Sequence, residues 1–274
     1  MKTDLNNLRR YGVELEFVSN HDRYEMARLI EQATGQRITV AGYSDKSNKW
    51  RLKSDSSVSG RGMYGMELVT PILKGEADMD LLKRIVAVCD EHGNVNKSCG
   101  MHVHVDITNA SATPLKKLMK FFAKYENAIG GVLSESRRGS NNGYCRNHFS
   151  GSESLVQVFG NLNGKDERHL IGHRYFSQRG KWNFQNYWRH GSVENRSHQG
   201  TLNVAKVENW VRLTQAIVAC AFESRGQVAH ATDTTSTYTT KDMLDDLRGK
   251  KYITLPVKKF YMNRFKELNN AICR

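Results

Sequence analysis

Two histidines stand two residues apart in the segment SCGMHVHVD, at residues 98–106. If this segment is a strand, successive side chains point to opposite faces, so His102, His104 and Asp106 share one face. The methionine and the two valines that alternate with them share the other face, which suits burial against a core. The strand therefore presents two imidazoles and a carboxylate together, either as a functional site or as a solvated sheet face.

The same spacing joins ionisable residues in two further segments that are typical of strands. Glu14 and Glu16 share a face of YGVELEFV, and Glu194 and Arg196 share a face of SVENR. Two carboxylates this close raise each other's pKa unless a cation lies between them. Carboxylate oxygens with an occasional imidazole suit Mg²⁺ or Mn²⁺, so a divalent metal is one solution. Glu67 in GMELVTP is a further candidate ligand.

Each of these pairs taken alone has a simpler explanation. A Glu pair in a strand is more often a solvated face, a His pair is often structural, and an exposed Glu–Arg ion pair contributes little stability. Their combination, with apolar residues on the opposite faces, favours one polar site. Arg196 suits a phosphate oxygen in such a site, because its planar guanidinium binds that geometry bidentately.

Hydrophobic spacing predicts the elements that must carry these residues. Strands are expected at 11–18, within 49–57 and 63–73, at 98–106 and within 173–197, and helices at 23–35, 78–93 and 204–224. Residues 134–165 are rich in Gly, Ser, Asn and Arg, which favours a long loop. We therefore expect one catalytic domain over residues 1–274, with a loop-rich insertion at 134–165 and a helical part at 204–274.

The formal net charge of +13 favours anionic partners such as nucleic acid, nucleotide phosphates or acidic substrates, and a solvated basic surface is the simpler alternative. Seven arginines in and after the predicted loop are expected to serve a polyanionic substrate: Arg137, Arg138, Arg146, Arg168, Arg174, Arg179 and Arg189. The sequence has no apolar run of membrane-spanning length, its first residues lack the apolar stretch of a secretory signal, and its five cysteines are scattered. These features predict a cytoplasmic protein without a membrane partner.

The motifs resemble those of the putative amidoligases, a branch of the carboxylate–amine ligases, in the family's order and over residues 11–213. GVELEF resembles the family's opening GxExE strand, and CGMHVHV resembles its CGxHVHV strand. KWRLKSDSSVSG with GMELVTPIL resembles the segment that bears its DGS element and a glutamate, and SVENRSHQGTLN resembles its closing VEFRxHxGTL stretch. The resemblance implies an α+β fold like that of glutamine synthetase and glutamate–cysteine ligase, with a curved, antiparallel-rich sheet and helices on its outer face.

The resemblance also implies roles for individual residues. The implied metal ligands are Glu14, Glu16, Glu67, His102 and Glu194. ATP is implied near His104, Arg196 and Arg174, and the implied catalytic residues are Arg196, Asp55 and His102. Substrate contacts are implied in the DGS-like and closing motifs, at Asp55, Ser57, His198 and Thr201.

The implied reaction is ATP-dependent formation of an amide bond through an acyl phosphate, with Mg²⁺, or alternatively Mn²⁺, as the metal. The carboxylate and amine substrates, which a peptide, protein or other macromolecule can carry, stay open, as do the oligomeric state and the general base. Two other functions also stay open: a metal-dependent phosphoesterase or nuclease, which explains the positive charge directly, and a nucleic-acid-binding module on the same fold. The sequence departs from the family at Ser56, which replaces the glycine of DGS, and at Asn195, which replaces an aromatic residue.

Overall fold

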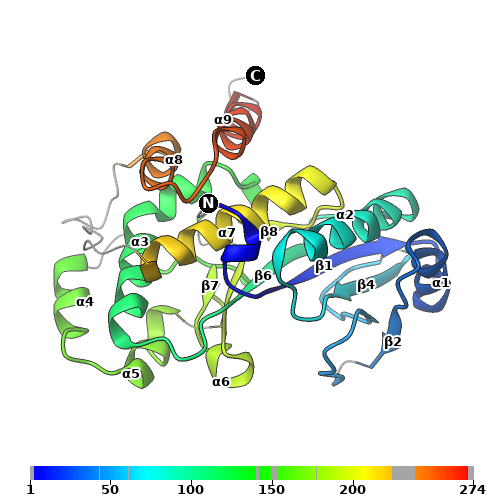
Figure 1. The fold of residues 1–274 in the computed structure, drawn as a ribbon, viewed down its shortest axis with the longest axis horizontal. Coiled ribbons are helices and arrows are strands. Elements are labelled where there is room, and N and C mark those ends of the chain that lie inside the picture. Colours follow the sequence, from blue (N-terminus) through cyan, green and yellow to red (C-terminus); the bar gives the residue numbers. More distant parts are fainter. Residues whose placement is uncertain are drawn as a thin grey trace. The chain divides into compact units, whose positions relative to one another are not determined.

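A computed structural model describes residues 3–42, 44–60, 62–139, 142–149, 154–176, 178–223 and 238–270. The described chain is a mixed α and β fold with an open sheet of eight strands (Figure 1). It divides into two compact units, Asp4–His104 with His198–Val211, and Met1–Thr3 with Val105–Ser197 and Arg212–Arg274. We call the former the first unit and the latter the second unit.

The first unit carries the strands on which most of the predicted ligands lie. Its strands are β1 (Tyr11–Ser19), β2 (Thr39–Ala41), β3 (Arg51–Lys53), β4 (Tyr64–Val69), β5 (Gly93–Asn94) and most of β6 (Gly100–Asp106). β1 pairs antiparallel with β4 and β5, β3 pairs antiparallel with β4, and β2 pairs parallel with β3. In the strand order β1 stands between β4 and β6. The strands expected at 11–18, within 49–57 and 63–73, and at 98–106 are thus confirmed.

Alternation in β1 follows the sequence pattern, with one difference. Val13, Leu15 and Phe17 are almost completely buried, as a strand period of two predicts. Glu16, on the opposite face, is only 6% exposed as well. The polar face of β1 is therefore covered at its centre and is not a solvated sheet face.

Two helices pack together in the first unit, and a third begins there. α1 (Arg23–Thr34) begins where the Asp22 side chain accepts hydrogen bonds from two backbone N–H groups, and it ends at Gly35 with φ 72°. α2 (Gly75–His92) packs against α1 and runs alongside β1 in Figure 1. α7 (Val204–Glu223) begins in the first unit and ends in the second. These helices confirm the three expected at 23–35, 78–93 and 204–224.

The second unit is mainly helical. Its helices are α3 (Ala112–Gly130), α4 (Leu155–Asn161), α5 (Glu167–Ile171), α6 (Tyr187–His190), α8 (Thr240–Gly249) and α9 (Leu255–Asn270), and its 3-10 turns are η2 (Glu135–Arg137) and η3 (Arg174–Phe176). Its strands are β7 (Trp182–Asn183) and β8 (Ser192–Gln199). The last two residues of β8 belong to the first unit. β7 and β8 pair antiparallel. The indole of Trp182 stacks on Phe122 of α3, with 4.1 Å between the ring centroids, and this contact fastens β7 to the helical core.

Two expectations for the second unit are wrong in part. Residues 134–165 contain η2 and α4, because Ser154 caps α4 and the buried Leu155, Val158 and Phe159 give it an apolar face. Among the described residues of 173–197, which leave out residue 177, the strands are β7 and most of β8, while η3 and α6 are helical turns. Helices α8 and α9 agree with the helical part expected at 204–274, and residues 224–237 of that part lie outside the described residues.

Of the strand pairs named above, β1–β4, β1–β5, β3–β4 and β7–β8 are antiparallel, as expected, and β2–β3 is parallel. The glutamine synthetase-like curvature and the outer layer of helices stay predictions.

Among the helices of the described residues, none combines the length and the apolar composition that crossing a membrane requires.

Candidate active site

The carboxylates of Glu16 and Glu67 lie on neighbouring strands and oppose each other. The register of β1 and β4 pairs the two residues directly, which places their Cβ atoms about 4.5–5.5 Å apart. His102 on β6 joins them, and one ligand atom from each of the three lies within 4.8 Å of the others. Glu16 and His102 are buried, and Glu67 is half-buried. The structure therefore brings together three of the predicted metal ligands.

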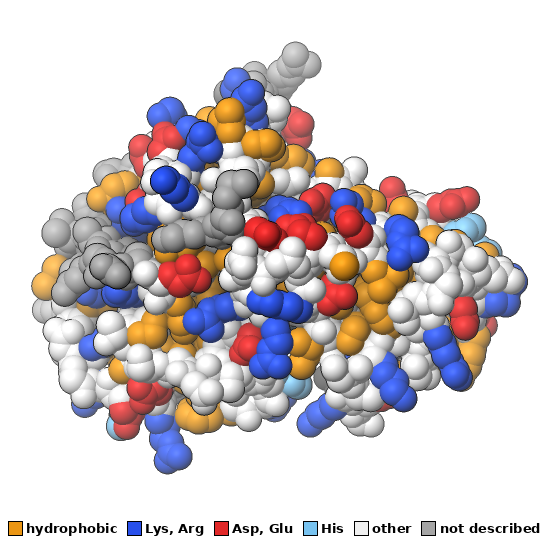
Figure 2. Space-filling view, in the orientation of Figure 1, with side chains coloured by type: hydrophobic (Ala, Val, Ile, Leu, Met, Phe, Trp, Pro, Cys, Tyr) orange, Lys and Arg blue, Asp and Glu red, His pale blue; other side chains and the backbone are white. Residues whose placement is uncertain are grey.

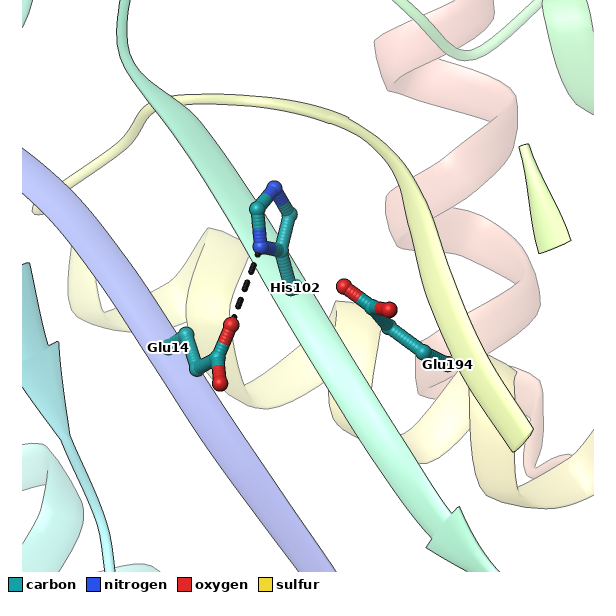
Figure 3. Close-up of side chains that lie close together, drawn as sticks. All are labelled: Glu14, His102 and Glu194. Carbon is teal, nitrogen blue, oxygen red and sulfur yellow. Dashed lines mark hydrogen bonds and ion pairs between the residues drawn. The ribbon is translucent and has the colours of Figure 1, made fainter. Parts of the chain in front are cut away.

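Two imidazoles flank the carboxylate of Glu14. His102 Nδ1 lies 3.1 Å from Glu14 Oε2, the contact drawn in Figure 3, and His104 Nε2 lies 3.4 Å from Glu14 Oε1. His102 Nε2 is also 3.8 Å from Glu16 Oε1, and Glu16 Oε2 accepts a hydrogen bond of 2.6 Å from the Gly100 N–H. These contacts define the carboxylate–imidazole cluster, which consists of Glu14, Glu16, Glu67, His102 and His104.

Burial and charge shift the pKa values of Glu14 and Glu67 in opposite directions. Burial raises the pKa of Glu67 well above its usual value, and the negative charges of Glu14 and Glu16 raise it further. Burial also opposes ionisation of Glu14, but the charge of His104 and the hydrogen bonds from His102 and His104 outweigh it and hold the pKa of Glu14 well below its usual value. Without a cation in the cluster, Glu14 stays ionised and Glu67 readily keeps a proton.

The donor atoms of Glu16, Glu67 and His102 fit a divalent metal. A buried and a half-buried carboxylate that oppose each other need either a proton or a cation to remove their repulsion. Two carboxylate oxygens with one imidazole nitrogen suit Mg²⁺ or Mn²⁺, ions that also keep water or phosphate oxygens in their coordination shell. The residues present therefore agree with the predicted metal.

Binding of Mg²⁺ is expected to release protons and to tighten as the pH rises. The raised pKa of Glu67 keeps this side chain protonated over part of the range in which an ordinary glutamate is ionised, and the metal needs the carboxylate. Affinity should increase as pH rises through that pKa and level off above it. Calorimetry in two buffers of different ionisation enthalpy counts the protons released. Proton-free binding at every pH, or affinity that falls as pH rises, contradicts the assignment.

A second cluster surrounds Glu194 on β8, a residue also drawn in Figure 3. The Glu194 side chain is 2% exposed. Its Oε1 lies 2.5 Å from Arg196 Nη1, its Oε2 accepts a hydrogen bond of 2.9 Å from Asn183 Nδ2, and Asn186 Nδ2 also donates to Oε2. Three donors on one buried carboxylate fix its orientation, and through it the orientation of the Arg196 guanidinium.

Sequence reasoning missed both asparagines of this second cluster. Asn183 lies directly opposite Glu194 in the pairing of β7 with β8, and a single sequence does not reveal which strands pair. The sequence contains one weak indication of Asn183. Asparagine is depleted in strands, so an asparagine within the aromatic run KWNF indicates a specific interaction of its side chain.

Asp55 and Ser57, the residues of the DGS-like element, form a local turn. Asp55 Oδ1 accepts hydrogen bonds of 2.7 Å from both the backbone N–H and the hydroxyl of Ser57. The negative charge of Asp55 also raises the pKa of Glu67, so this turn acts electrostatically on the carboxylate–imidazole cluster. The catalytic and substrate roles implied for the two residues stay predictions.

The remaining predicted site residues have mainly structural contacts. His198 packs against Trp210 with 4.8 Å between ring centroids, and Thr201 Oγ1 accepts a hydrogen bond of 3.2 Å from the Asn203 N–H just before α7. Arg174 lies exposed in η3, so the strand expected to carry it is wrong. The ligand roles implied for these residues stay predictions.

Of the seven arginines expected to serve a polyanionic substrate, Arg137 is buried, so its side chain is not exposed for such a contact. Arg137 is 4% exposed, and its Nη1 lies 3.7 Å from Cys145 Sγ. Arg138 donates hydrogen bonds of 2.9 Å to Leu133 O and to Asn269 Oδ1. The exposed members are Arg146, Arg168, Arg174, Arg179 and Arg189. On the face drawn in Figure 2, Lys and Arg side chains are interspersed with acidic and apolar ones.

Comparison with known families adds an independent finding. A family model with the description "Putative amidoligase enzyme" matches residues 7–218. The match includes the carboxylate–imidazole cluster and the Glu194–Arg196 pair, and it ends before α8 and α9. Comparison with curated proteins gave no match.

Proposed function

The chain belongs to the amidoligase family and is an enzyme of the ligase type, and we propose that it joins a carboxylate to an amine at the expense of ATP, through an acyl phosphate. The observation that carries the proposal is the opposed pair Glu16–Glu67 with His102 beside it. This buried group has a physical reason to bind a divalent cation, and a metal–nucleotide complex is the form of ATP that phosphoryl transfer uses.

The proposed reaction has two steps that balance. A carboxylate oxygen of the acid substrate attacks the γ-phosphorus of ATP, the bond to the bridging oxygen breaks, and ADP leaves. The amine then attacks the acyl carbon, inorganic phosphate leaves with the bonding electron pair, and the amine nitrogen loses a proton to give the amide. Both steps move negative charge between oxygens, so positioning and charge neutralisation supply most of the catalysis.

The residues of the two clusters suit different parts of this chemistry. Glu16, Glu67 and His102 would hold Mg²⁺, which when bound neutralises phosphate oxygens. The ion contact with Glu194 holds the guanidinium of Arg196 in one orientation, and a planar guanidinium binds two oxygens of a phosphoryl group at once. We therefore assign the transferred phosphoryl group to Arg196 and the orientation of Arg196 to Glu194.

The decisive experiment follows ADP release with pooled amino acids, peptides and nucleic acid, and identifies products by mass spectrometry. Once a pair of substrates is found, the acid is labelled with ¹⁸O in its carboxylate. An acyl phosphate requires one ¹⁸O atom to appear in inorganic phosphate for each amide formed. Amide formation with unlabelled phosphate contradicts the intermediate. ATP hydrolysis or phosphodiester cleavage without any amide product supports the metal-dependent phosphoesterase instead.

A further inference from the structure

The second unit contains a polar cavity that the proposed mechanism does not use. It has a volume of about 310 Å³, near the lower end of the range of roughly 300–1,000 Å³ that small-molecule sites occupy. Its polar lining comes from α3, the loop after η2, the residue before β7 and the end of α9: Glu126, Asn127, Arg138, Asn147, Lys181 and Asn269. A volume of this size suits a molecule as small as an amino acid and is small for a nucleotide.

Lys181 is the most informative residue of the lining. Lys181 is only 2% exposed. Its ammonium donates hydrogen bonds to Gly139 O at 3.3 Å and to the side-chain oxygen of Asn147. Both hydrogen-bond acceptors are uncharged, and the nearby carboxylate of Glu126 offsets only part of the cost of burial, because burial still lowers the pKa of Lys181. A buried ammonium whose charge is compensated only in part is costly. A cavity beside this charge offers room for an anionic group of a ligand to offset that cost.

The position of Lys181 connects the cavity with the Glu194–Arg196 pair. The Arg196 N–H donates a hydrogen bond of 2.8 Å to Lys181 O, which continues the pairing of β7 with β8 by one residue beyond Trp182. Lys181 therefore stands opposite Arg196, just as Asn183 stands opposite Glu194. The backbone of Lys181, a residue of the cavity lining, is therefore joined directly to the backbone of Arg196.

The cavity also has a negative side. Glu126 is buried, with its Oε1 2.5 Å from the His148 N–H and its Oε2 3.3 Å from the Phe149 N–H. Gly130 and Gly131 line the cavity at the end of the 19-residue α3, where the helix dipole places partial negative charge. Positively and negatively charged groups therefore line the same cavity.

The end of α9 helps to close the cavity. Asn269 accepts from Arg138 Nη1 at 2.9 Å and donates to Gly131 O at 3.0 Å, so it joins the loop after η2 to the end of α3. Asn269 lies outside residues 7–218, the part of the chain that the family model matches. This wall of the cavity is therefore supplied by a segment beyond the family's shared region.

We propose that this cavity binds a zwitterionic α-amino acid, with the ligand's carboxylate at Lys181 and its ammonium toward Glu126 and the end of α3. The lining charges match the two groups of such a ligand, and the volume matches its size. The binding site stands on its own observations. Its part in catalysis rests on the proposed function, under which the amino acid is one of the two substrates of the ligase.

Binding is tested on the full-length chain without ATP. The twenty common α-amino acids are screened by thermal shift, and the affinity of the best is measured by calorimetry beside its deaminated acid and its decarboxylated amine. We expect the amino acid to bind and both analogues to bind at least about 10-fold more weakly, since each lacks one of the two charges. Equal binding of the deaminated acid, or of inorganic phosphate, shows a simple anion site and overturns the proposal, as does the absence of any binding.

Three variants locate the binding. Asn127 is an exposed residue at the cavity, so Asn127→Phe should narrow the cavity without disturbing the core and weaken binding at least about 10-fold. Asn263→Phe makes the same change at an exposed position of α9 that does not line the cavity, and it should bind normally. Lys181→Met should bind the amino acid and its decarboxylated amine equally. Normal binding to Asn127→Phe overturns the proposal.

The two proposals fail separately. If an amino acid binds and Asn127→Phe weakens it, but no amide forms with any acid tested, the cavity stands and the ligase function fails. If Asn127→Phe loses amino-acid binding but forms amide at the normal rate, the ligase function stands and the part of the cavity in catalysis fails.

Discussion

Glu16→Gln is expected to lower ligase kcat/KM at least about 100-fold and to remove the Mg²⁺ dependence of ATP binding. Charge neutralisation by a bound metal contributes several kcal/mol to such reactions, and each 1.4 kcal/mol corresponds to about a factor of ten in rate. The variant keeps an oxygen that accepts the hydrogen bond from the Gly100 N–H. It also removes the repulsion between Glu16 and Glu67, which oppose each other on β1 and β4. The melting temperature should therefore stay the same or rise while activity is lost.

The matched control is Glu25→Gln, the same substitution on α1 of the first unit, where the Glu25 side chain is 39% exposed. Glu25 pairs with Arg28 on α1 and contributes little to stability, because the pair is solvent-exposed. The activity of this control, measured by ADP release, should match that of the unaltered protein. The Mg²⁺ dependence of its ATP binding, measured by calorimetry, should match as well. Retention of Mg²⁺-dependent ATP binding in Glu16→Gln would show that the metal ligands lie elsewhere.

Arg196→Lys is expected to lower kcat by about 100- to 1,000-fold, the usual effect of removing one group that stabilises charge in the transition state. The lysine keeps a positive charge near Glu194, so the buried carboxylate retains an ionic partner and the fold should persist. It loses the planar guanidinium that binds two phosphoryl oxygens together. The KM for ATP should change only a few-fold, because the proposed interaction strengthens as the phosphoryl group is transferred.

The matched control for this variant is Arg248→Lys, on an exposed arginine of α8 in the same unit. Kinetics of both variants with the substrates found by ADP release separate the two kinetic constants, and thermal melting reports on folding. A variant Arg196→Lys with normal kcat and a raised KM would assign Arg196 to ground-state binding of ATP and not to the transferred group.

Local patterns allowed several features to be predicted from the sequence. The alternation of Val13, Leu15 and Phe17 with the glutamates predicts both the strand and its buried side, because side-chain direction in a strand depends on neighbouring residues alone. The acidic cap at Asp22 and the glycine at position 35 bound α1 for similarly local reasons. Family motifs, which are also local, identified five residues that the fold assembles into the carboxylate–imidazole cluster.

Other features depend on contacts between distant segments. The register that opposes Glu16 to Glu67 joins β1 to β4 across about fifty residues of chain, and it converts two separate glutamates into a repelling pair with a shifted pKa. The burial of Arg137, and that of Phe176 in η3, arise from tertiary packing, which overrides local preference in short segments. The turn α6 has no buried residue and ends locally at Gly191, with φ 62°.

The sequence by itself determined which faces of β1 and β6 are polar, where α1 begins and ends, and to which family the chemistry belongs, since all three follow from residues close together in the chain. Only the tertiary structure decided that Asn183 and Asn186 hold Glu194, and that Lys181 stands opposite Arg196 beside a cavity that Asn269 helps to close. The reason is physical: a hydrogen bond or a cavity wall requires atoms within a few ångströms, and strand pairing and helix packing, not sequence spacing, bring those atoms together.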